Sequence, residues 1–240
     1  MTILSDGPDL RATVAQACRL LAARGMVEGA LGHVSARVGE DEIVIRCRGP
    51  AERGLAHTRP DDVWRVRLDG EPVDVPTGYG LPKELPLHTE LLRARPDVGA
   101  VVHAHPHSAL LCTLADLQPR AVYGAFDIPG MRMARRGIPV YDRPVLIRRP
   151  DLAREMVEAM GDADVCLLKG HGVTVAGETV EQAAVRAVRL DTVLCVTVEL
   201  ARLGADPPEL TERDLAEMPD LGMAFNDGLV WRTLVASLPG

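Results

Sequence analysis

Short apolar or β-branched runs alternate with helical stretches along this chain, and their irregular order is the feature that most constrains the fold. The runs lie at 42–47, 63–68, 98–105, 140–147, 165–169 and 173–176. Runs of this length and composition are typical of β-strands. Because no regular strand–helix–strand repeat connects them, we expect a single α/β or α+β domain.

Helical spacing and capping signals separate these runs. They predict four helices, at Leu10–Val27, Glu84–Arg95, Asp151–Met160 and about Thr179–Leu203. Asp151 is expected as an acidic N-cap, and Thr179 with Gln182 three residues later forms the pattern of a capping box. The Gly- and Pro-rich segment 76–82 is expected to be a loop. The tail after Pro207 has no pattern that determines its structure.

Composition and charge restrict the class of protein. Lys and Arg total 27 against 34 Asp and Glu, a net charge of −7, so nucleic-acid binding through phosphate contacts is not expected. No run approaches about eighteen apolar residues, and Met1–Leu10 lacks a charged start followed by an apolar stretch, so neither a membrane span nor a leader is expected. The five cysteines are scattered singly, which is typical of reduced thiols in a core. We therefore expect a cytoplasmic protein.

Two histidines lie two residues apart at the end of the run 98–105. In a strand, side chains at i and i+2 project from the same face, so His103 and His105 can reach one ion together. His171 stands between two glycines after another β-type run, where the backbone can approach closely. Each pattern alone is also typical of ordinary core, surface or turn residues. Together they form a three-histidine set with open coordination positions, as catalytic metal sites require, and imidazole ligation favours zinc over the alternatives manganese and iron.

Glu84 is the candidate proton carrier. It begins a predicted helix, where the positive end of the helix dipole favours a carboxylate, although a first-turn glutamate commonly serves only to stabilise its helix. His88 lies on the same helix face and is expected to hydrogen-bond Glu84 or to support the site from behind. No Gly-x-Ser-x-Gly, Walker A or Gly-x-Gly-x-x-Gly pattern offers another chemistry, so metal-assisted catalysis is the hypothesis that remains.

Five motifs in one order resemble the class II aldolase/adducin family, which contains fuculose-phosphate aldolase and ribulose-phosphate 4-epimerase. The motifs are Gly32–Arg37, Thr58–Asp62, Glu84–His88, Val101–Pro106 and Gly170–Gly172. The resemblance implies a three-layer α/β/α fold with a central, largely antiparallel sheet, which we expect to form one domain over residues 1–240. It also implies a homotetramer with sites at subunit interfaces. By this likeness His103, His105 and His171 bind one divalent metal ion per subunit, and Glu84 is an acid/base that can also touch the metal.

Three positions depart from the sugar-phosphate members of that family and point to the substrate. Where those members typically carry small phosphate-binding residues, this chain has Gly32-His33, Arg48-Gly49 and Pro82-Lys83. Arginine pairs with carboxylates through two hydrogen bonds, and lysine supplies a point charge, so a small anionic substrate fits. The expected substrate-binding residues are His33, Ser35, Arg48, Gly49 and Lys83.

This pattern is similar to the family's decarboxylase branch, which acts on hydroxylated aromatic dicarboxylates such as dihydroxyphthalate. We expect a metal-dependent lyase that releases carbon dioxide through a metal-stabilised carbanion or enolate, with Glu84 or a water it holds returning the proton. Two alternatives remain. One is a sugar-phosphate aldolase, epimerase or dehydratase with Arg48 and Lys83 as phosphate ligands. The other is an adducin-like structural protein without catalysis, against which the retained histidines and Glu84 argue.

Overall fold

A seven-stranded sheet in the order β3-β2-β1-β4-β7-β6-β5 forms the middle of the molecule, in a computed structural model that describes residues 8–238. The strands are β1 (His33–Arg37), β2 (Glu42–Arg46), β3 (Val63–Arg67), β4 (Ala100–Ala104), β5 (Val140–Tyr141), β6 (Val165–Leu168) and β7 (Gly172–Gly177). Five neighbouring pairs are antiparallel, and the β5–β6 pair is parallel. The prediction of a central, largely antiparallel sheet is confirmed. Most of Met1–Leu10, where a leader was not expected, lies outside the described residues.

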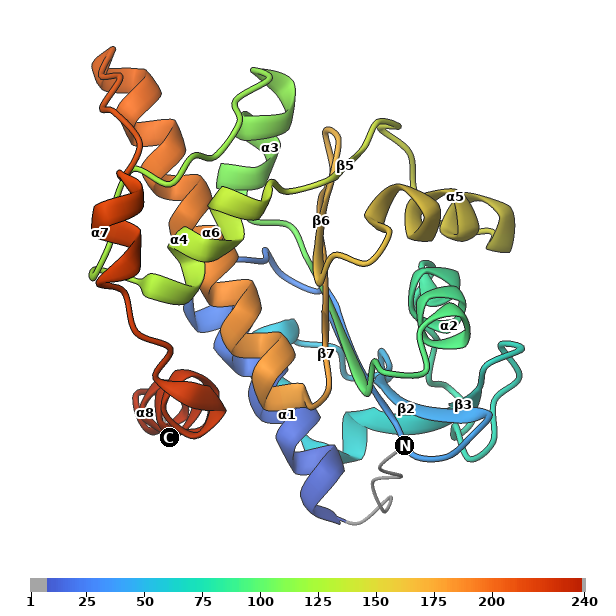
Figure 1. The fold of residues 1–240 in the computed structure, drawn as a ribbon. Helices are drawn as coiled ribbons and strands as arrows, with labels where there is room; N and C mark the ends of the chain where they lie inside the picture. Colours follow the sequence, from blue (N-terminus) through green and yellow to red (C-terminus); the bar gives the residue numbers. More distant parts are fainter. Residues whose placement is uncertain (1–7, 239–240) are drawn as a thin grey trace.

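Helices cover both faces of this sheet (Figure 1). On one face lie α2 (Leu85–Ala94) and α5 (Pro150–Met160), which pack with the sheet into one hydrophobic core. The helices on the other face are α1 (Pro8–Ala23), α3 (His107–Leu114), α4 (Ile128–Arg136), α6 (Val180–Leu203) and α8 (Val230–Ala236). The sheet is thus the middle of three layers. The predicted α/β/α class is confirmed.

Helices cover both faces of the sheet, so each polar side chain of a strand faces one of the two helical layers. In β1, Val34 and Ala36 belong to the core under α1 and α6. Side chains alternate along a strand, so His33 and Ser35 face the α2 layer instead. Strand β1 therefore contributes Val34 and Ala36 to the core on one face and directs His33 and Ser35 toward α2 on the other.

The longest helix begins and ends where its capping signals place it. The Oγ1 atom of Thr179 accepts a hydrogen bond from the Gln182 N–H (3.2 Å), and Gly204 ends α6 in the left-handed conformation. The side chain of Gln182 reaches back to the N–H of Glu178 (2.8 Å), one residue before the expected partner. For α5, the predicted N-cap was wrong: Arg149 is the N-cap, Pro150 opens the helix, and Asp151 lies in its first turn.

The strand predicted over 140–147 is present but much shorter, because only Val140–Tyr141 pairs with the sheet. Pro144 has no N–H to donate to a sheet ladder, and it interrupts the run. The N–H of Ile147 instead donates to the Glu84 carboxylate. The departure of this segment from the sheet therefore supplies a contact to the candidate site.

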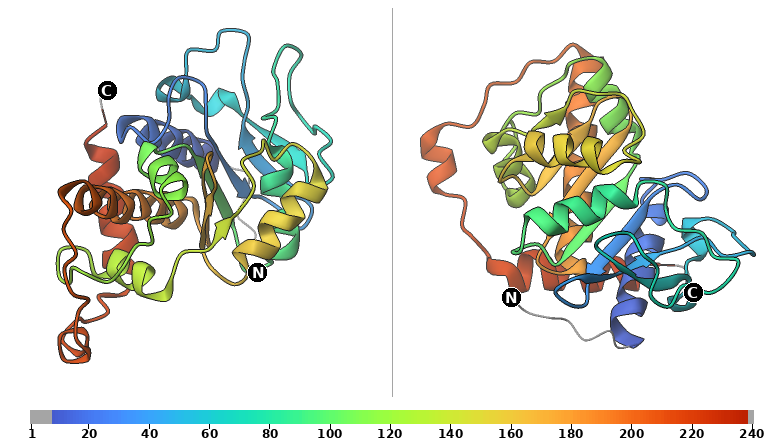
Figure 2. Two further views of the ribbon diagram at one scale, coloured as in Figure 1. Left: turned by 90° about the horizontal axis from the view of Figure 1, so that it is seen from above. Right: turned by 90° about the vertical axis from the view of Figure 1, so that its right-hand side faces the viewer.

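Several elements had no prediction from sequence, namely β1, α3, α4 and the helices of the tail. The tail forms the short helix α7 (Glu212–Ala216), a π-helical turn at Ala224–Leu229, and α8. Figure 2 shows α7 standing away from the sheet on an extended stretch of chain. Across residues 8–238, no helix has the length and apolar character needed to cross a membrane. The five cysteines are free thiols, four of them buried, with Cys195 exposed.

Candidate metal centre

Four side chains from distant parts of the chain meet at the ends of the central strands. They are Glu84, His103, His105 and His171, and one ligand atom from each lies within 4.8 Å of the others. Glu84 precedes α2, His103 is in β4 and His105 directly follows it. His171 occupies the turn between β6 and β7. These are the four residues that the sequence grouped as metal ligands and proton carrier.

The orientation of His103 is set by the neighbouring strand. In the β4–β7 ladder His103 lies opposite Thr174, and the Nδ1 of His103 donates to the carbonyl of Val173 (3.0 Å). Because Nδ1 is engaged with this carbonyl, Nε2 is the ring nitrogen directed toward His105 and Glu84. A backbone carbonyl that selects the tautomer in this way is the usual outer partner of a metal-binding histidine.

The turn that carries His171 depends on the two glycines around it. Gly170 has a φ of +60°, which a residue with a side chain rarely adopts. At Gly172 a Cβ atom would lie 2.3 Å from the carbonyl oxygen of Ala104 and 3.0 Å from Cδ2 of His105. The absence of a side chain at Gly172 therefore lets the start of β7 approach the end of β4. This close approach brings His171 beside His105, with ring centroids 4.8 Å apart.

Glu84 is fixed from two sides. Its Oε1 accepts a hydrogen bond from the N–H of Ile147 (2.9 Å), while Oε2 lies 3.2 Å from Nε2 of His103 and 3.4 Å from Nε2 of His171. Burial by itself would raise the pKa of this carboxyl. The interactions with His103 and His171 outweigh burial and hold the pKa of Glu84 well below its usual range. Glu84 is therefore an anion at neutral pH.

The donor set fits a divalent cation. His103 and His105 place their Nε2 atoms 2.8 Å apart, and burial, followed by the neighbouring His103 and His171, lowers the pKa of His105 to about 3. Both ring nitrogens of His171 are buried without a hydrogen-bond partner among the described residues. A buried polar atom without a partner costs free energy that a bound ion would recover. Three imidazoles and one carboxylate are ligands that Zn²⁺, Mn²⁺ and Fe²⁺ accept.

A second layer of polar side chains lies behind the cluster. His33 pairs with His103 across the β1–β4 ladder, and their rings stack with centroids 4.9 Å apart. Nδ1 of His33 lies 2.6 Å from Nε2 of His88, whose Nδ1 lies 2.7 Å from Oγ of Ser35. Burial lowers the pKa of His33 well below its usual value and that of His88 to about 3. His88 bonds His33 and Ser35 rather than Glu84. Of its two predicted roles, it therefore has the one of supporting the site from behind.

With this geometry in place, comparison with known proteins gives the family. A family model described as the class II aldolase and adducin N-terminal domain matches residues 12–198. The chain belongs to this family.

Two similar relatives have the same name, which is more specific than that of the family. The chain is 50% identical over 231 residues to the 3,4-dihydroxyphthalate decarboxylase of Arthrobacter keyseri, covering 95% of this chain and 93% of that protein. It is 45% identical over 235 residues to the protein of the same name from Rhodococcus jostii, covering 97% of each. An aldolase II superfamily protein from Pseudomonas syringae has a similar fold, with a TM-score of 0.79, 22% identity, and coverage of 96% and 92%. The predicted resemblance to the decarboxylase branch of this class of lyases is confirmed.

The remaining expected substrate-binding residues have their contacts outside the cluster. The Nη2 of Arg48 donates to the carbonyl of Ala30 (3.2 Å), and its backbone pairs with that of Gly80. Gly49 lies against the Tyr79 ring, and Lys83 is exposed immediately before Glu84. Across residues 8–238, no hydrogen bond or ion pair joins Arg48, Gly49 or Lys83 to the four clustered side chains.

Sequence reasoning did not find the main-chain groups that orient the cluster. The carbonyl of Val173 and the N–H of Ile147 are supplied by backbone, so no side-chain pattern marks them. Strand β1 carried a signal that was not used. Its alternation of His33, Ser35 and Arg37 with apolar Val34 and Ala36 has the period of two that is typical of a strand.

Proposed function

We propose that this protein is a metal-dependent decarboxylase of a hydroxylated aromatic dicarboxylate, with 3,4-dihydroxyphthalate as the first substrate to test. The observation that carries the proposal is the identity of 45–50% with proteins of that name over nearly the whole chain. The cluster of one carboxylate and three imidazoles supports it, because breaking a carbon–carbon bond needs a site that stabilises the electron pair left behind.

His103, His105 and His171 are the proposed metal ligands, with Glu84 as a further ligand when no substrate is bound. A divalent ion held there would act as a Lewis acid, polarising substrate oxygens and stabilising the negative charge that develops as carbon dioxide leaves. Zinc is the ion we propose first, because neutral imidazoles suit it, with manganese and iron as the other ions to test.

Glu84 is the proposed proton carrier. Its lowered pKa makes it a carboxylate before substrate binds, so it can accept a proton from a substrate hydroxyl or from a bound water. As the carbon–carbon bond breaks, the electron pair stays on the ring carbon, and Glu84 or the water that it holds returns a proton to that carbon. Carbon dioxide and a dihydroxybenzoate are the products, and the net reaction consumes one proton.

His33, Arg48, Gly49 and Lys83 are the proposed substrate contacts around this centre. Arg48 and Lys83 would pair with the carboxylate that the product retains, while Gly49 leaves room beside the Tyr79 ring. Ser35 is not proposed as a substrate contact, because it is completely buried and its hydroxyl bonds His88.

We also propose that the protein is a homotetramer with sites near subunit interfaces. The side chain of Leu114 is 63% exposed, and it lies beside Gly170, next to His171. An exposed leucine at the edge of a polar site is a surface that a neighbouring subunit can cover. Light scattering on the purified protein would give the mass of a single chain if the proposal is wrong.

The cytoplasm is the proposed location of the protein. Its free cysteines, four of them buried, are consistent with a reducing compartment, since the structure uses none of them in a disulfide among the described residues. Cell fractionation with compartment markers would test this proposal, and recovery of the protein outside the cytoplasmic fraction would contradict it.

The function is tested by incubating the protein, supplied in turn with Zn²⁺, Mn²⁺ or Fe²⁺, with 3,4-dihydroxyphthalate and, in parallel, with fuculose and ribulose phosphates. We expect release of carbon dioxide from the aromatic acid alone. Glu84→Gln should reduce turnover by about 100-fold or more while metal stays bound. Arg48→Ala should weaken substrate use about tenfold, and Arg53→Ala, an exposed arginine of the same loop, should not. Turnover of a sugar phosphate without decarboxylation would overturn the proposal.

A further inference from the structure

Three polar side chains behind the metal cluster form a linear hydrogen-bonded series. Oγ of Ser35 meets Nδ1 of His88 at 2.7 Å, and Nε2 of His88 meets Nδ1 of His33 at 2.6 Å. Ser35 and His88 are completely buried, and His33 is 4% exposed. Both nitrogens of His88 are engaged, so this ring has no further hydrogen-bonding capacity.

The direction of these hydrogen bonds follows from the serine hydroxyl. Among residues 8–238, Nδ1 of His88 is the one hydrogen-bond partner of Oγ of Ser35. If His88 donated through Nδ1, the hydroxyl hydrogen of Ser35 would be buried without an acceptor, which is costly. Ser35 therefore donates, and His88 accepts at Nδ1.

The direction of this hydrogen bond also determines which nitrogen carries the proton in His88 and in His33. Because Nδ1 of His88 accepts, its proton is on Nε2, and Nε2 donates to Nδ1 of His33. His33 then carries its own proton on Nε2, at the tip of the ring away from His88. One buried hydroxyl thus determines the tautomer of two rings.

We propose that Ser35 and His88 are positioning residues, which hold His33 in the tautomer whose Nε2–H is a hydrogen-bond donor for an oxygen atom of the substrate. The inference deepens the proposed function and rests on it for the identity of that oxygen, a carboxylate or phenolic oxygen of the aromatic acid. His33 lies directly across the ladder from His103 and stacks on its ring, so the ring that carries this donor flanks the metal cluster.

A neutral donor suits this place better than a cation would. His33 is within ring-stacking distance of a proposed metal ligand, and a positive charge there would oppose a divalent ion. The neutral N–H attracts an anionic oxygen without that repulsion. The tautomer also matters for selection, because an acceptor nitrogen in the same place would repel the same oxygen.

The tautomers can be read directly by two-bond ¹⁵N–¹H spectra of histidine-labelled protein, recorded without metal and after addition of Zn²⁺. The variants His33→Asn and His88→Asn assign the signals. We expect both His33 and His88 to carry the proton on Nε2 near neutral pH. A proton on Nδ1 of His33, or a doubly protonated ring, would overturn the proposal without any substrate being involved.

Ser35→Ala removes the donor that sets the direction, and Thr89→Val is its matched control. Thr89 is one residue from His88 on α2, is 5% exposed, and bonds the carbonyl of Pro86. Ser35→Ala should mix the two tautomers of His33 and raise KM about tenfold, with a smaller change in kcat. Thr89→Val should leave the spectrum and KM unchanged, whatever its effect on Tm. Unchanged spectra in Ser35→Ala would also overturn the proposal.

Failure of this inference and failure of the proposed function are distinguishable. If the wild-type protein does not decarboxylate the aromatic acid, the tautomer spectra still decide whether Ser35 and His88 orient His33. If the wild type is active but Ser35→Ala keeps its KM, the decarboxylase function stands and the positioning role does not.

Discussion

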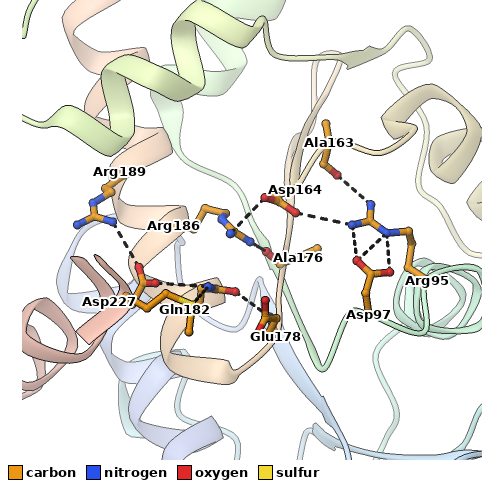
Figure 3. A network of polar contacts seen from close by, with 11 residues as sticks. Arg95, Asp97, Ala163, Asp164, Ala176, Glu178, Gln182, Arg186, Arg189 and Asp227 are labelled. Atoms are coloured by element: carbon orange, nitrogen blue, oxygen red, sulfur yellow. Dashed lines mark hydrogen bonds and ion pairs between the residues drawn. The ribbon is translucent and has the colours of Figure 1, made fainter. Parts of the chain in front are cut away.

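Two partly buried polar regions of this molecule differ in how their polar groups are paired. Between α6 and the end of α2, arginines and carboxylates form a network in which Asp164 lies between Arg186 (3.2 Å) and Arg95 (3.7 Å) (Figure 3). Further along α6, Arg189 pairs with Asp227 (3.4 Å). At the ends of the central strands, one carboxylate instead meets three imidazoles, and both nitrogens of His171 lack a hydrogen-bond partner among the described residues.

The polar groups of the arginine network stabilise the fold, whereas those of the imidazole cluster can bind a ligand. Arginine remains charged at any pH a protein meets, and Arg186 and Arg189 are each paired with carboxylate and carbonyl oxygens of the chain itself. Burial lowers the pKa of His105, and nitrogen atoms of three imidazoles lie close to one carboxylate. A divalent cation would complete this arrangement. Four substitutions test this contrast.

Removing one imidazole should break the metal centre and spare the fold. We expect His103→Ala to lower zinc affinity by more than about 100-fold, because loss of outer partners alone costs 10–100-fold in such sites. Elemental analysis after dialysis should find about one ion per chain in the wild type and almost none in the variant. Far-ultraviolet circular dichroism should be unchanged. Equal metal in both proteins would show that His103 is not a ligand.

Gly172→Ala should damage the same centre without removing any ligand. The added Cβ would lie 2.3 Å from the carbonyl oxygen of Ala104, so β7 must shift away from β4 and carry His171 with it. We expect a loss of stability of about 1–3 kcal/mol together with weaker zinc binding, measured by urea unfolding and by titration. Gly39→Ala is the control, because its Cβ would meet nothing within 4 Å. Unaltered zinc affinity in Gly172→Ala would contradict the close-approach argument.

The arginine network should affect stability and not the metal. Arg186→Met keeps apolar length but loses the pairing with Asp164 and the hydrogen bond to the carbonyl of Ala176. Because Asp164 is 41% exposed and keeps Arg95, we expect a loss of about 1–2 kcal/mol. Zinc content and activity per folded molecule should match the wild type. A loss of bound zinc in this variant would mean that the two regions are not independent.

The smallest expected effect is a pH dependence at the exposed end of the network. Hydrogen bonds from Arg95 lower the pKa of Asp97 in the folded protein. This interaction therefore stabilises the fold at pH values above the unfolded pKa and is lost as pH falls through the lower folded pKa. Asp97→Asn should flatten the loss of Tm on acidification by an amount equivalent to less than about 1 kcal/mol, since the pair is exposed. A steeper acid dependence in the variant would reverse the assigned sign.

Local sequence patterns were sufficient for the elements whose signals are contained within a few residues. The N-cap of Thr179 and the left-handed Gly204 delimit α6 because a cap needs only neighbouring backbone groups. The His-x-His spacing likewise predicted a shared face, since strand geometry alone determines it. The strand predicted over 140–147 was too long, because apolar composition does not show whether a strand partner is available beyond Pro144.

The amino-acid sequence by itself determined the family, the three-layer fold and the set of Glu84, His103, His105 and His171 as chemically special residues. Only the tertiary structure decided how these residues are oriented. The tautomer of His103 depends on the carbonyl of Val173, and Glu84 is held by the N–H of Ile147. The hydroxyl of Ser35 points to His88 rather than to a substrate. Hydrogen bonds are directional and join groups 53 to 70 positions apart in these three cases, so no local pattern of residues could specify them.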